Sequence, residues 1–85
     1  MINELITRSL NAIASDYDEG VVILKHYLVP EMWEMCLEDR YVALNVLDDI
    51  SAYLRDIIDN ELEQSIEIRF VCKKTKTFIY ISCPE

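Results

Sequence analysis

Carboxylates dominate residues 48–63, "DDISAYLRDIIDNELE", a stretch with six acids and a single arginine. On a helix turning 100° per residue, four of the acids fall within an arc of about 100° opposite the apolar side. These four are Asp48, Asp49, Asp56 and Asp59. Exposed helices usually pair acids with bases four residues away, because each pair adds a few tenths of a kcal/mol. Here only Arg55 lies at the edge of the arc, so the sequence predicts an acidic face suited to a basic partner.

Charge is also segregated along the chain, whose net charge is −8. Residues 1–64 hold fourteen acids and four bases, whereas residues 65–85 hold two acids and four bases. Solubility alone explains such an excess, and so does a fold in which Lys73, Lys74 and Lys76 fold back on the acids, in the same chain or in a dimer mate. A third explanation is a partner with a basic surface, since spaced carboxylates imitate the phosphates of a nucleic acid. The same charge argues against direct binding of nucleic acid.

Other residues with chemical potential lack a supporting pattern. His26 is the only histidine, and no nucleophile context surrounds it. "DYDEG", residues 16–20, begins like a calcium loop but has Gly20 at loop position five and Tyr27 at position twelve, where the pattern requires ligands. One glycine in the whole chain excludes the dinucleotide fingerprint and the P-loop. We therefore expect no enzyme activity, no catalytic residue, no metal site and no cofactor.

Apolar residues make up 52% of the chain, more than a domain of 85 residues easily buries. The excess suggests a homodimer interface or a docking patch. Trp33, in "PEMWEMCL", either completes the core or anchors a partner, because tryptophan and methionine are enriched at interfaces. We include Trp33 and Glu38 with the four aspartates as predicted partner-binding residues. The alternative function is a small structural or adaptor subunit that associates through apolar surface.

Localisation is predicted from three features. The three cysteines, Cys36, Cys72 and Cys83, match no zinc or redox spacing. Glu4 and Arg8 interrupt the apolar stretch that a signal peptide needs. No run approaches the ~18 apolar residues of a membrane helix. We expect a cytoplasmic protein that does not interact with membranes.

At this length we expect the chain to form a single domain over residues 1–85. Apolar spacing predicts an amphipathic helix at 3–15 with Asn3 as its cap, and a long helix from about 39 to 60. Between them, Pro30 is expected to begin a short helical turn at 30–37.

Residues 21–28, "VVILKHYL", fit a buried helix or a buried strand; we favour the helix, with a strand as the alternative. Alternating residues at 66–72 and 77–83 predict a hairpin with a four-residue loop. The predicted fold class is therefore α+β, with three to four helices followed by a C-terminal antiparallel β-hairpin and a third strand at 21–28 as the alternative.

In size, acidity and scarcity of glycine, the chain resembles the inhibitors that phages and mobile elements direct against restriction, CRISPR or repair nucleases. It also resembles bacterial immunity proteins that neutralise nuclease toxins. The resemblance rests on charge and size and involves no sequence motif. It implies a non-catalytic, DNA-mimic inhibitor of a nucleic-acid-handling enzyme, active in the host cytoplasm if a phage encodes it.

Overall fold

The computed structural model describes the backbone of residues 2–60 and 66–82, and the side chains of residues 3–55 and 66–82. The elements follow one another as α1 (Ile2–Ser15), β1 (Val22–Leu28), β2 (Glu31–Leu37), α2 (Arg40–Asn60), β3 (Glu67–Cys72) and β4 (Thr77–Ser82). The predicted α+β class is confirmed. The predicted count of three to four helices is wrong, because the described residues form two helices and four strands.

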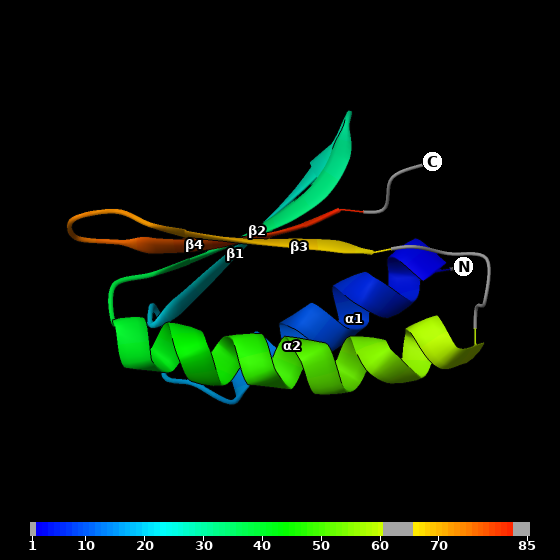
Figure 1. The fold of residues 1–85 in the computed structure, drawn as a ribbon, viewed down its shortest axis with the longest axis horizontal. Coiled ribbons are helices and arrows are strands. Elements are labelled where there is room, and N and C mark those ends of the chain that lie inside the picture. Colours follow the sequence, from blue (N-terminus) through cyan, green and yellow to red (C-terminus); the bar gives the residue numbers. More distant parts are fainter. Residues whose placement is uncertain (1, 61–65, 83–85) are drawn as a thin grey trace.

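The four strands form one antiparallel sheet in the order β1-β2-β4-β3. Two hairpins are thus joined side by side through β2 and β4. Both helices lie against one face of this sheet, and no described segment covers the other face (Figure 1). The far end of the β1–β2 hairpin rises away from the two layers (Figure 1).

The first hairpin corrects two predictions. Residues 21–28 are not a helix, and the strand alternative is confirmed, since Val22 pairs with Leu37 and Leu28 with Glu31. The helical turn expected at 30–37 is also wrong, because this segment is strand β2 and Pro30 lies in the turn before it. In β2, buried and partly buried residues alternate with the two-residue period of a strand.

The other predicted elements are confirmed. Helix α2 begins where Asp39 caps it, since Asp39 Oδ1 accepts hydrogen bonds from the backbone N–H groups of Tyr41 at 2.8 Å and Val42 at 3.3 Å. In the C-terminal hairpin, Cys72 pairs with Thr77, and Lys73 N–H donates to the Lys76 carbonyl at 2.8 Å. Helix α1 is also present, but Asn3 is not its cap, because the Asn3 amide donates to Glu31 instead.

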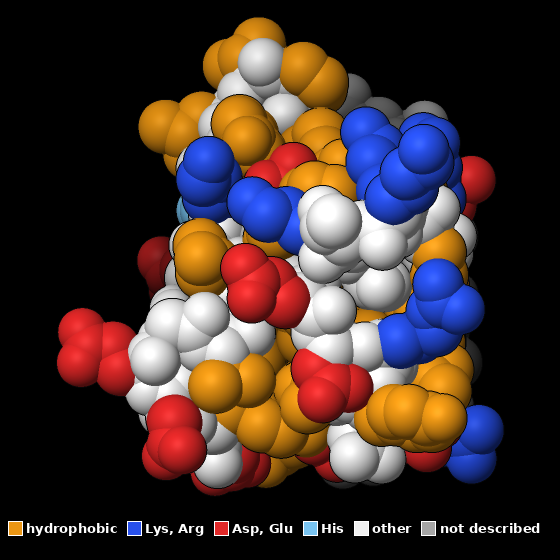
Figure 2. Space-filling view, turned by 90° about the vertical axis from the view of Figure 1, so that its left-hand side faces the viewer, with side chains coloured by type: hydrophobic (Ala, Val, Ile, Leu, Met, Phe, Trp, Pro, Cys, Tyr) orange, Lys and Arg blue, Asp and Glu red, His pale blue; other side chains and the backbone are white. Residues whose placement is uncertain are grey.

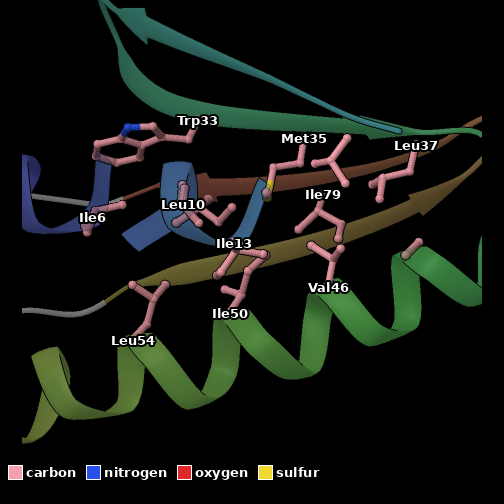
Figure 3. Close-up of a cluster of buried hydrophobic side chains, with 13 residues drawn as sticks. Ile6, Leu10, Ile13, Trp33, Met35, Leu37, Val46, Ile50, Leu54 and Ile79 are labelled. Atoms are coloured by element: carbon pink, nitrogen blue, oxygen red, sulfur yellow. The ribbon is translucent and has the colours of Figure 1, made fainter. Parts of the chain in front are cut away.

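The core lies between the helices and the inner face of the sheet (Figure 3). Each element except β3 contributes to its fully or nearly fully buried side chains, which are Ile6, Leu10, Ile13, Val22, Trp33, Met35, Leu37, Ala43, Val46, Ile50, Leu54, Ile79 and Ile81. Trp33 is 0% exposed, so it completes the core, and the prediction that it anchors a partner at the surface is wrong.

No helix within the described residues has the length and apolar character needed to span a membrane.

Candidate functional site

Acidic side chains gather at the end of the molecule where β1 begins and β2 ends. We define the acidic end as the exposed residues of the α1–β1 loop, the β2–α2 connection and the first half of α2, namely Asp16, Asp18, Glu19, Glu38, Asp39 and Asp48. In the view towards this end, acidic side chains are spread over the lower part, and most basic ones lie higher or to the right (Figure 2). The acids thus occupy one part of this end, although exposed Arg40 directly follows Asp39 at the start of α2.

Two contacts bring these segments together. The pairing of Val22 with Leu37 places the α1–β1 loop beside the β2–α2 connection. Tyr17, in the same loop, lies close enough to Asp49 of α2 for the Asp49 charge to raise the pKa of its hydroxyl. The acids of three separate segments thus share one surface, and the turn at Gly20, where φ is +87°, lets the loop enter β1.

The predicted contact residues have different positions in the structure. Asp48 and Glu38 are exposed at the acidic end, whereas Asp49 is half-buried and lies near Tyr17. The side chains of Asp56 and Asp59 lie outside the described residues.

Three acids of the α1–β1 loop, Asp16, Asp18 and Glu19, were not predicted as contact residues. The cluster "SDYDEG" was visible in the sequence, but it joins the other acids only because residues 22–28 are a strand.

The acids of this surface have no basic partners in the described part of the chain. No lysine or arginine forms an ion pair there, and the contact between His26 Nε2 and Glu31 Oε2, at 2.8 Å, involves an imidazole. Lys73 instead lies over the ring of Phe78, with its ammonium 5.4 Å from the ring centroid. Within one chain, no lysine of the hairpin loop forms an ion pair with these acids among the described residues, and contact with the acids of a dimer mate stays a prediction.

Tyr17 shows how the acidic end affects a neighbouring group. Burial raises the pKa of its hydroxyl above the usual 10.0, and the negative charges of Asp49 and Asp16 raise it further. Tyrosinate would be desolvated and would face two carboxylates, so the folded protein favours the neutral phenol.

We expect this pKa shift to lower the free energy of unfolding at alkaline pH. Above the unfolded pKa, the unfolded chain loses the Tyr17 proton while the folded chain retains it, so the free energy of unfolding falls as pH rises through the folded pKa. Tyr17→Phe should reduce the slope of this loss above pH 10.0, the ordinary pKa of tyrosine, in urea unfolding. Tyr41→Phe, which removes an exposed tyrosine, should keep the wild-type slope; equal slopes for Tyr17→Phe and the wild type would contradict the contact.

A pocket of about 450 Å³ lies at the opposite end of the β1–β2 hairpin, between that hairpin and the first turns of α1. Its lining residues are Asn3, Glu4, Thr7, Arg8, His26 and Glu31. The ring of His26 stacks on buried Trp33, with centroids 4.8 Å apart and planes 9° from parallel. Both Asn3 and His26 bind the Glu31 carboxylate.

This network leaves few of the pocket's polar groups free. The Thr7 hydroxyl accepts a hydrogen bond from Trp33 Nε1 at 2.9 Å and donates to the Asn3 carbonyl at 2.9 Å. No group of three or more metal-ligating side chains that could hold an ion occurs among the described residues. The network therefore fastens the hairpin to α1, and Arg8 and Glu4 are the charged side chains with no described partner.

The open face of the sheet carries a second hollow, of about 330 Å³. Tyr80 and Phe78 lie along β4 with their rings stacked 6.1 Å apart, and the Arg69 guanidinium lies 5.9 Å from the Tyr80 centroid. Burial and the neighbouring Glu34 raise the pKa of Tyr80. These contacts cover the aromatic rings with the chain's own cations, so this face offers less free charge than the acidic end.

The protein is thus a two-layer α+β structure with acidic residues at one end of the β1–β2 hairpin and a pocket at the other end. Comparisons with protein families, with curated proteins and with solved structures found no match.

Proposed function

We propose that the protein is a non-catalytic inhibitor whose acidic end binds a basic surface of a nucleic-acid-handling protein. The observation that carries the proposal is that six exposed carboxylates share one end, while no lysine or arginine forms an ion pair among the described side chains. Surface charges without an ion-pair partner stay hydrated, and their electric field attracts a partner of opposite charge. Such a field gives fast association and selects basic partners over acidic ones.

The arrangement of the acids favours a binding site for a nucleic acid backbone as the target. The carboxylates come from two loops and one helix, so they extend over a surface instead of converging in a cleft. Basic channels that bind nucleic acids contact a series of phosphates in a comparable way. Restriction, CRISPR and repair nucleases have such channels, as do nuclease toxins, and we place the interaction in the cytoplasm.

Capture from a lysate of the native host tests this proposal. The tagged protein should retain a basic, nucleic-acid-binding partner at about 50 mM salt and lose most of it at about 200 mM, because salt screens exposed charge pairs. Retention that does not change between the two washes would contradict an acidic interface. Beads carrying the same tag alone control for proteins that bind the matrix.

A second candidate function is supported by a different observation. Leu28 is 74% exposed and Val29 is 93% exposed, at the end of the hairpin that rises from the body. Exposed apolar residues that adjoin one another are typical of interaction sites. The alternative is therefore an adaptor subunit that associates through this turn, with its acids serving solubility.

A further inference from the structure

We infer that the apolar turn and the adjacent pocket form a two-fold interface between two copies of this chain. The turn consists of Tyr27, Leu28, Val29 and Pro30, all exposed. The pocket begins at the residues on either side of the turn, His26 and Glu31. This inference goes beyond the proposed inhibitor function. It names a second copy of the chain as the partner that covers the apolar turn, the feature on which the second candidate function rests.

The first argument is geometric. In a two-fold interface each copy presents the same patch, so a projection and the hollow that receives it must lie together on one surface. The turn is the projection, since Val29 is 93% exposed and the hairpin end rises out of the sheet (Figure 1). The pocket of about 450 Å³ is the hollow, and its volume is within the range of pockets that accept apolar groups. Reciprocal insertion fills both pockets and covers both turns.

The second argument is local charge balance. Copies with a net charge of −8 repel one another across most of their surface. The turn itself carries no charge, and the pocket adds two acids, Glu4 and Glu31, and one arginine, Arg8. Because Arg8 has no ion-pair partner among the described residues, it is free to pair with Glu4 of a second copy. Two acidic molecules therefore repel one another less across this patch than across their acidic ends, where six exposed carboxylates lie together.

The third argument is rigidity. His26, Glu31 and Asn3 hold the base of the hairpin to α1 through hydrogen bonds, and the His26 ring stacks on buried Trp33. The turn is thus presented from a fixed base, which lowers the entropy lost on association. The acidic end lies at the other end of the same hairpin, so a dimer formed in this way leaves both acidic ends free.

Sedimentation equilibrium over about 10 µM to 1 mM tests the inference, because an interface of modest area gives affinities on the order of micromolar. The wild type should rise from its monomer mass of 10.0 kDa towards twice that mass. Leu28→Ser with Val29→Ser should stay monomeric over the whole range. The matched control, Tyr41→Ser with Leu44→Ser, removes two exposed apolar residues of α2 and should dimerise like the wild type.

Amide shifts give a second measurement that does not depend on the variants. On dilution of the wild type, changes should concentrate at residues 27–31 and in the first two turns of α1. A wild type that remains monomeric at the highest concentration overturns the inference, even if the turn captures another protein. Shifts confined to the open sheet face or to the acidic end overturn it as well. None of these outcomes bears on salt-sensitive capture by the acidic end, so the two proposals fail separately.

Discussion

Replacing Trp33 by alanine is expected to lower the free energy of unfolding by about 3–5 kcal/mol, as truncation of a buried aromatic residue does. Trp33 is wholly buried beneath α1, and its Nε1–H donates to the Thr7 hydroxyl. The variant therefore loses core volume, a hydrogen bond and the surface on which His26 stacks. Because small domains are stable by only about 5–15 kcal/mol, this single change removes a large part of the total.

Urea unfolding followed by circular dichroism measures the loss. The control is Tyr41→Ala, which truncates an aromatic residue that is 81% exposed and should change stability by less than about 0.5 kcal/mol. If Trp33→Ala does not fold, Trp33→Phe retains an apolar ring and should give a smaller but measurable loss. Equal stability of Trp33→Ala and Tyr41→Ala would show that Trp33 is not part of the core.

Helical periodicity predicted both helices because their buried stripes are regular. In α2, Ala43, Val46, Ile50 and Leu54 repeat at threes and fours, and all four are buried. The C-terminal hairpin was equally predictable, since Ile79 and Ile81 face the core while Phe78 and Tyr80 face away from it. In these segments the local pattern and the tertiary burial agree.

The β1–β2 hairpin could not be predicted in the same way. Valine and isoleucine at 21–23 favour a strand, but Val21, Leu24 and Leu28 also form a helical ridge, so the pattern is ambiguous. Pro30 was interpreted as a helix start, although proline is as common in turns between strands. The partner of β1 decides the outcome, because a strand at a sheet edge is specified by the register with its neighbour.

The acidic end was only partly predictable for the same reason. Helical geometry alone showed that Asp48 is exposed. Asp16, Asp18 and Glu19 join Glu38 only through the pairing of Val22 with Leu37, a contact between residues far apart in the sequence. Asp49 is predicted to contact a partner, yet it is half-buried near Tyr17, a position that the helical pattern of α2 gives no means to foresee.

Charge reversal at the acidic end is expected to weaken binding of the captured partner by roughly 100-fold or more, because opposing like charges cost several kcal/mol. Asp18→Lys with Glu19→Lys replaces two exposed acids of the α1–β1 loop. Glu4→Lys with Glu67→Lys changes the net charge equally at exposed positions outside the acidic end and should retain most of the affinity. A similar loss for both pairs would show that net charge matters and the surface does not.

Competition with a nucleic acid tests the central claim most directly. The purified partner is loaded with a fluorescent oligonucleotide at about 50 mM salt, where phosphate contacts are strong, and the wild-type protein is titrated in while anisotropy is followed. Our account predicts that the wild type displaces the oligonucleotide fully, that the Glu4/Glu67 variant does so nearly as well, and that the Asp18/Glu19 variant does not. A partner that holds the oligonucleotide and the wild-type protein at the same time would contradict it.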